Sequence, residues 1–176
     1  MKSRTILEVA AIAATIVIVA TNCSDSAKPG SSGRVSSDTP ISIEPGVCVG
    51  KVRPGMTVDE VIAELGKPDS QTGGGLEYLR HGFAVSPGRD GTVRAVLCGD
   101  SSGINGPLVK AFTGRTKEGI GMGSSRVQVV SVYGEPPEKE KTLAGREVVK
   151  CGSLGLTFSL ENDKTHHIIV DFRKIK

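Results

Sequence analysis

The fold is decided by RPGMTVDEVIAELGKPD, residues 53–69, and by GMGSSRVQVVSVYGEPP, residues 121–137. When the two stretches are aligned, the same kinds of residue recur at matching positions. The matched pairs are Gly55 and Gly123, Thr57 and Ser125, Glu60 and Gln128, Gly66 and Gly134, and Pro68 and Pro136. The alignment predicts that one structural element occurs twice in the chain.

Each stretch has the pattern of a short capped helix. Thr57 with Glu60, and Ser125 with Gln128, have the spacing of a capping box, in which two side chains bond the free amides of the first helical turn. Apolar residues follow at helical spacing, and a glycine then a proline mark the end of each helix. We expect helices over Thr57–Gly66 and Ser125–Gly134.

Three apolar, β-rich segments follow each helix, separated by turns such as PGRDG and ENDK. Short helices and isolated three-stranded sheets are not stable alone in water, so each helix should lie across its own sheet, and the sheets should join or pack. The predicted fold class is α+β, with two tandem αβββ repeats. The predicted strands are Leu76–Arg80, Gly82–Ser86 and Thr92–Cys98 in the first repeat, and Glu147–Cys151, Gly155–Leu160 and His166–Phe172 in the second.

The remaining segments complete a plan of five parts. Residues 1–22 are a predicted signal peptide, and residues 23–45, which are rich in Ser, Pro and Gly, are a predicted disordered tether. Residues 46–100 form the first repeat and residues 119–176 the second. Residues 101–118 connect them, with a short helical turn expected at Leu108–Phe112.

The N-terminus has the composition of an export signal. Lys2 and Arg4 precede an apolar run, Val9–Thr21, which as a helix would be about 20 Å long and too short for a hydrocarbon core of about 30 Å. A cysteine at the end of such a run, here Cys23, resembles the bacterial lipoprotein signal, which implies lipid attachment at that thiol. A signal cleaved by ordinary signal peptidase and an uncleaved anchor are the alternatives, and all three place residues 24–176 outside the cytoplasm.

Three cysteines remain after Cys23, in a compartment that permits disulfides. Cys48 and Cys98 would bracket the first repeat, so they are the suggested pair, which leaves Cys151 either free or paired with another chain. The spacings match no zinc motif. We expect no bound metal.

The composition argues against several functions. The chain has 22 Lys and Arg against 19 Asp and Glu, and no Trp, which is unlike a nucleic-acid-binding protein. The glycines of residues 119–123 read as a helix entry and not as a phosphate loop. His166 and His167 are adjacent, so on a regular strand they would face opposite sides and could not share a metal ion. We expect no catalytic residues, no cofactor and no small-molecule substrate.

The first repeat resembles a known family. The string V-x-x-GMT-x-[DE]-x-V-x-x-x-LG-x-P, present as Val52–Pro68, and the later Glu77–Leu79 and Gly82–Val85 resemble the SmpA/OmlA/BamE family of small outer-membrane lipoproteins that assist assembly of β-barrel proteins. A tandem of such units is similar to the β-lactamase inhibitory protein fold. The resemblance covers residues 46–98 and, more weakly, 119–172.

These observations lead to an expected function. The chain should be a lipid-anchored protein of the cell envelope, on the periplasmic face of the outer membrane, that is not an enzyme. It should bind another envelope or secreted protein, for example in envelope or outer-membrane assembly. The alternative is an inhibitor of a secreted hydrolase, as the likeness to the inhibitor fold implies.

Overall fold

The computed structural model describes residues 41–99, 110–136 and 140–174. These residues belong to one compact unit, Asp38–Lys176. The predicted signal peptide, the proposed lipid-attachment residue Cys23 and residues 24–40 of the predicted tether lie outside the described residues.

Both predicted helices are present, as α1 (Val58–Leu65) and α2 (Arg126–Tyr133). In α1 the Thr57 hydroxyl accepts a hydrogen bond from the Glu60 amide, and the Glu60 carboxylate accepts one from the Thr57 amide at 2.7 Å. Ser125 and Gln128 exchange the same two bonds at the start of α2. The predicted capping boxes and the two helices are therefore confirmed.

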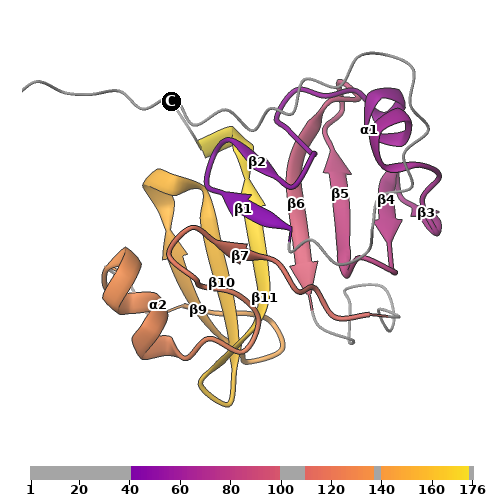
Figure 1. Cartoon of the computed structure of the whole chain (residues 1–176). Coiled ribbons are helices and arrows are strands. Elements are labelled where there is room, and N and C mark those ends of the chain that lie inside the picture. Colours follow the sequence, from indigo (N-terminus) through magenta and orange to yellow (C-terminus); the bar gives the residue numbers. More distant parts are fainter. Residues whose placement is uncertain (1–40, 100–109, 137–139, 175–176) are drawn as a thin grey trace, which may run out of the picture. The chain divides into compact units, whose positions relative to one another are not determined.

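The strands form one large antiparallel sheet of eight strands, in the order β3-β4-β5-β6-β11-β10-β9-β8 (Figure 1). The six predicted strands overlap β4, β5, β6, β9, β10 and β11, with ends that differ by two residues at most, whereas β3 and β8 were not predicted. Two 3₁₀ turns, η1 (Gly152–Leu154) and η2 (Phe172–Lys174), flank β10 and β11. The mixed α+β class is confirmed. The strands are β3 (Ser70–Thr72), β4 (Gly75–Tyr78), β5 (Phe83–Pro87), β6 (Val93–Gly99), β8 (Glu140–Lys141), β9 (Glu147–Cys151), β10 (Leu156–Glu161) and β11 (Lys164–Asp171).

The first and second halves of the chain meet at the centre of this sheet. Strand β6 pairs with β11 in antiparallel register, with Cys98 opposite Ile168 and Val96 opposite Val170. Strands β3 to β6 therefore continue directly into β11 to β8, as the change of colour across the sheet in Figure 1 shows. From the sequence, the two sheets were expected either to join or to pack on each other. In the structure they join edge to edge.

A second, three-stranded sheet corrects the predicted end of the tether. It consists of β1 (Ser42–Glu44), β2 (Cys48–Val49) and β7 (Arg115–Thr116), in the order β2-β1-β7. The prediction that the disordered tether reaches residue 45 is wrong, because Ile43 is fully buried in β1.

The connector is also more structured than predicted. Strand β7 pairs in parallel with β1, and Phe112 is buried. Residues 110–112, the described part of the predicted helical turn, are not helical.

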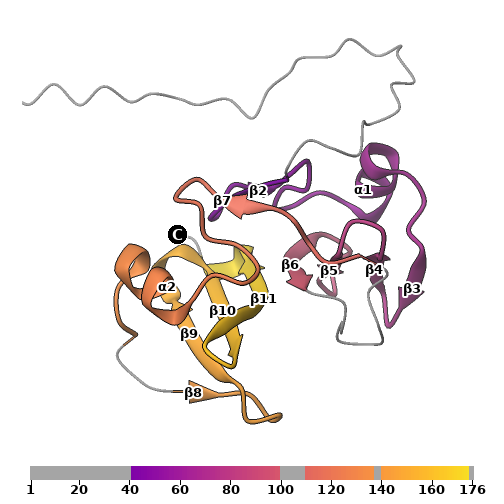
Figure 2. The same ribbon diagram turned by 60° about the horizontal axis from the view of Figure 1, so that its bottom comes forward.

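Both helices and the three-stranded sheet pack on the same face of the large sheet (Figure 2). Val61 of α1 and Val129 of α2 are each the one fully buried residue of their helix. The Tyr78 hydroxyl of β4 donates a hydrogen bond to the Gly66 carbonyl at the end of α1, and Tyr133 of α2 stacks on Phe158 of β10 with centroids 5.5 Å apart. A single hydrophobic core thus runs across both halves.

Candidate functional site

The strand registers divide the large sheet into two unlike faces. Residues directly opposite one another in antiparallel strands share a face. The face toward the helices, called here the core face, carries large apolar side chains that are all buried: Leu76, Tyr78, Phe83, Val85, Val96, Cys98, Val149, Cys151, Leu156, Phe158, Leu160, Ile168 and Val170.

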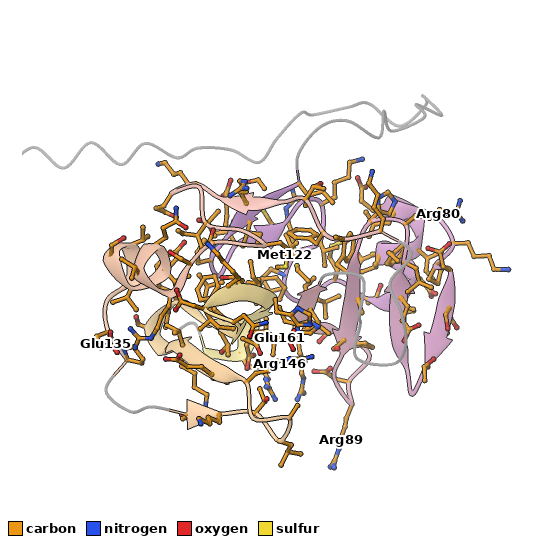
Figure 3. The ribbon with its side chains drawn as sticks, turned by 90° about the horizontal axis from the view of Figure 1, so that it is seen from below. Arg80, Arg89, Met122, Glu135, Arg146 and Glu161 are labelled. Carbon is orange, nitrogen blue, oxygen red and sulfur yellow. The ribbon has the colours of Figure 1, made fainter. Side chains whose placement is uncertain are left out.

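The opposite face, called here the open face, carries smaller side chains. Among residues 41–99, 110–136 and 140–174, no helix or second sheet packs against it (Figure 3). It is therefore a surface that the described fold leaves available to a partner over part of its width, since Val148, Ser159, His167 and Asp171 on this face are buried. The registers assign to it Glu77, Ala84, Ser86, Ala95, Leu97, Val148, Lys150, Thr157, Ser159, His167, Ile169 and Asp171.

The centre of the open face is aliphatic and its ends are charged. Leu97 of β6 lies opposite both Ala84 of β5 and Ile169 of β11, and all three are partly exposed. Glu77 of β4 lies toward one end, and Lys150 of β9, ion-paired with Glu140 of β8, lies toward the other. An apolar centre within a polar rim is the usual anatomy of a protein-protein interface.

A β-bulge alters the expected placement of the two adjacent histidines. Pairing between β10 and β11 shifts from Ser159–His167 to Leu160–Thr165, which leaves His166 as the extra residue. The prediction that the rings face opposite sides is wrong, because a bulge interrupts the strand alternation. The rings of His166 and His167 lie edge to face, with centroids 4.4 Å apart.

The histidine pair has polar neighbours. His166 Nδ1 lies 3.3 Å from a carboxylate oxygen of Glu161. Ser159 lies directly opposite His167, and the two side chains are 8 % and 7 % exposed. The Ser159 hydroxyl makes no hydrogen bond with any described residue, whereas a nucleophilic serine is normally activated by a hydrogen-bonded base. In the described part of the chain no group of three or more acidic, His or Cys side chains is arranged to hold a metal ion.

An open hollow of about 380 Å³ lies beside this cluster, between the β8–β9 and β10–β11 turns. Arg146 and Glu161 lie side by side at its wall, 3.7 Å apart (Figure 3). Lys141, Glu147 and Asp163 also line it. Because both signs of charge are present, the hollow favours neither an anion nor a cation.

The glycine-rich entry to α2 has its amides engaged within the fold. The Gly121 amide donates to the Ser124 hydroxyl at 3.1 Å, and the Gly123 amide donates to the Thr165 carbonyl at 2.9 Å. The equivalent Gly55 amide donates to the Val93 carbonyl. These bonds support the interpretation of the glycines as a helix entry.

The cysteines of the described residues are buried. Cys98 is a free thiol opposite Phe83 on one side and Ile168 on the other, and burial raises its pKa. Cys48 and Cys98 are both thiols in the structure, so the suggested Cys48–Cys98 disulfide is not formed. The Cys98 side chain is enclosed in the core face of the large sheet. Cys48 lies in β2 of the smaller sheet.

The sequence predicts binding through the sheet surface or the connecting loops, but it does not show which residues form the open face, because that depends on register. Strand β6 has three consecutive aliphatic residues, Ala95–Leu97, so alternation along it does not separate the two faces. Comparisons with protein-family models, curated proteins and solved structures give no match. None of the helices in the described residues has the length and apolar character needed to cross a bilayer.

Proposed function

We propose that this chain is an exported lipoprotein, anchored through Cys23, whose folded unit binds another envelope or secreted protein without catalysing a reaction. Envelope or outer-membrane assembly is the setting that the resemblance of Val52–Pro68 to the SmpA/OmlA/BamE family implies. The observation that carries the binding role is the open face of the large sheet, with its aliphatic centre and charged rim.

The proposal includes a duplicated unit, two tandem αβββ repeats fused through their last strands. The matched caps of α1 and α2 support it, and the contacts around them add further support. Gly55 and Gly123 each donate to the start of the strand that ends their half, β6 or β11. Thr57 bridges Thr92, and Ser125 bridges Lys164, at the same place in each half.

The bulges support the duplication independently. In β6 the pairing with β5 shifts between Ser86 and Pro87, which leaves Arg94 as the extra residue. In β11 it shifts between Ser159 and Leu160, which leaves His166. Bulges are specific features of a fold, and two at matching positions are most simply explained by one ancestral unit.

The fusion accounts for the proposed docking surface. A single αβββ unit would expose the edge of its last strand, and an unpaired edge invites aggregation. Pairing β6 with β11 removes that edge from both units and doubles the width of the sheet. The outer edges are formed by β3 and β8, which have only three and two residues and are polar. Binding by strand addition at these edges is therefore disfavoured, and the broad open face is the favoured site.

Affinity capture from envelope extract tests the docking role. The bait is the folded unit, residues 38–176, as the natural sequence and with Leu97→Arg, which places a charge at the aliphatic centre of the open face. The matched control is Ala63→Arg, at an exposed position of α1 on the other side of the sheet. We expect the natural sequence and the control to recover the same protein, and Leu97→Arg to lose it.

The identity of the captured protein separates the two functional hypotheses. An assembly component supports the envelope role, whereas a secreted hydrolase that loses activity when bound supports the inhibitor alternative. Equal recovery by all three baits, with thermal unfolding showing that each is folded, would contradict docking at the open face.

A further inference from the structure

One row of side chains, called here the cross-strand row, crosses the open face with each member directly opposite the next on the neighbouring strand. It spans the six strands β4-β5-β6-β11-β10-β9 (Figure 1). Every member is at least partly exposed, whereas Val148, Ser159 and His167, two positions along β9, β10 and β11, are buried. In sheet order the row consists of Glu77, Ala84, Leu97, Ile169, Thr157 and Lys150.

The two halves of the chain contribute to the row in mirrored order. Leu97 and Ile169 meet at its centre, and Glu77 and Lys150 lie at its ends, each two strands away from the centre. The ends therefore occupy equivalent places in the two halves but carry opposite charges. A symmetric row would accept a partner equally well in either direction, so these two charges favour one direction over the other.

Both end charges can reach a partner. Glu77 is partly exposed, and the Lys150 side chain is 43 % exposed although it forms an ion pair with Glu140 of β8. An ammonium group has three donors, so the pairing with Glu140 leaves donors of Lys150 for a second oxygen.

The strands of the row fix the backbone conformation of the segment that fits it. Each of the six strands already pairs with a neighbour on both sides, so none can hydrogen-bond to a segment that lies across them. An extended segment would leave its own backbone groups unpaired where it is covered, which is costly. A helix satisfies its backbone internally. The row is five strand spacings, or about 24 Å, long, which matches a helix of about sixteen residues.

Resting on the docking role proposed above, we propose that the cross-strand row binds one amphipathic α-helix of the partner, with its N-terminal end at Glu77 and its C-terminal end at Lys150. A helix carries partial positive charge at its N-terminus and partial negative charge at its C-terminus, so this direction places each end beside the opposite charge. The apolar stripe of the helix lies on Leu97 and Ile169, as in other complexes that bind an amphipathic helix.

Photo-crosslinking of the full chain in envelope extract tests both the helix and its direction. Ala84 or Thr157 is replaced by the photo-reactive residue p-benzoylphenylalanine, and the exposed Ala63 of α1, on the other side of the sheet, is the control position. After irradiation, mass spectrometry identifies the partner residue that is joined to each position.

The expected spacing of the crosslinks follows from the sheet. Ala84 and Thr157 lie three strand spacings apart, about 14 Å, which corresponds to about ten residues of a helix. We expect both positions to crosslink to one helix of one partner at residues about that far apart, with the residue joined to position 84 nearer the N-terminus. Position 63 should give no crosslink to that helix.

Exchange of the two end charges tests the direction separately. The variant E77K/K150E keeps the net charge of the chain but sets a like charge beside each end of the bound helix. The matched control K51E/E64K exchanges an ion pair on the α1 side of the sheet. We expect the crosslinking yield to fall by about tenfold in E77K/K150E and to stay unchanged in K51E/E64K, with thermal unfolding showing that both are folded.

The outcomes separate this inference from the docking role. Crosslinked residues about four apart would indicate an extended segment, since a strand rises about 3.4 Å per residue. That spacing, the reverse order, crosslinks to separate segments or a crosslink from one position only would overturn the helix and leave the docking role standing. Equal yields from E77K/K150E and K51E/E64K would overturn its direction.

The absence of crosslinks from both Ala84 and Thr157 also has a defined meaning. If Leu97→Arg still loses the captured protein, the partner docks at the open face without lying along the row, and the inference is overturned. If Leu97→Arg captures that protein as well as the natural sequence does, the docking role itself fails and the inference fails with it.

Discussion

Replacing Ile168 by alanine tests whether the two halves share one core. Ile168 is fully buried and lies opposite Cys98 of β6 and Phe158 of β10, so it contacts strands from both halves. Truncation of a buried isoleucine to alanine typically lowers the free energy of unfolding by about 2 to 5 kcal/mol. Because Ile168 is fully buried in the core, we expect a loss of about 3 to 4 kcal/mol. Melting temperature should fall by roughly 10 °C for a unit of this size.

The neighbouring Ile169 provides the control. It points to the open face and is partly exposed, so Ile169→Ala should lower the free energy of unfolding by less than about 1 kcal/mol. The two variants remove the same atoms from adjacent positions, which isolates the effect of facing the core.

Urea unfolding followed by tyrosine fluorescence provides the assay. The chain has two tyrosines, Tyr78 in the first half and Tyr133 in the second, so Tyr78→Phe and Tyr133→Phe versions each report one half. With Ile168→Ala, both reporters should shift to lower urea by the same amount. A shift of the Tyr133 reporter alone, or equal effects of Ile168→Ala and Ile169→Ala, would refute the shared core.

Three further outcomes follow from local structure. Thr57→Ala and Ser125→Ala should each lower the free energy of unfolding by about 1 kcal/mol in urea titrations, because each removes one capping box; effects below about 0.3 kcal/mol would count against the caps. Gly82→Ala should lower the melting temperature far more than Gly91→Ala, since both have positive φ but only the Cβ at residue 82 would meet backbone, 2.3 Å away; equal losses would contradict this packing. Burial raises the pKa of Cys151 to about 11, above the unfolded value of about 8.5, so its contribution to stability is complete below about pH 8.5 and is lost as pH rises toward 11. Cys151→Ala should flatten that decline in urea titrations from pH 8 to 11, and an unchanged slope would argue against the shift.

The elements that the sequence predicts well are those specified by local chemistry. Thr57 and Ser125 mark the helix starts because a capping box needs only residues three positions apart, and Asn162 and Asp163 mark the β10–β11 turn because they tolerate positive φ. The residues that make up each of these signals lie within a few positions of one another. Each signal therefore does not depend on distant parts of the chain.

The features that the sequence does not predict depend on distant pairing. Ile43 looks like part of a polar tether until β7, more than seventy residues later, supplies a strand beside it. The placement of His166 beside His167 depends on a bulge that no single residue type specifies. The open face likewise follows from the register of β6 on β11, which no turn fixes because the two strands are distant in the sequence.

Nuclear magnetic resonance measurement of contacts between β6 and β11 tests whether the two halves of the chain share one sheet in this register. We expect cross-strand backbone contacts between Cys98 and Ile168 and between Val96 and Val170 in residues 38–176. Contacts shifted by one residue would set Leu97 opposite a core residue of β11, Ile168 or Val170, and contradict the open face. The lack of any contact between the two strands would contradict the joined sheet itself.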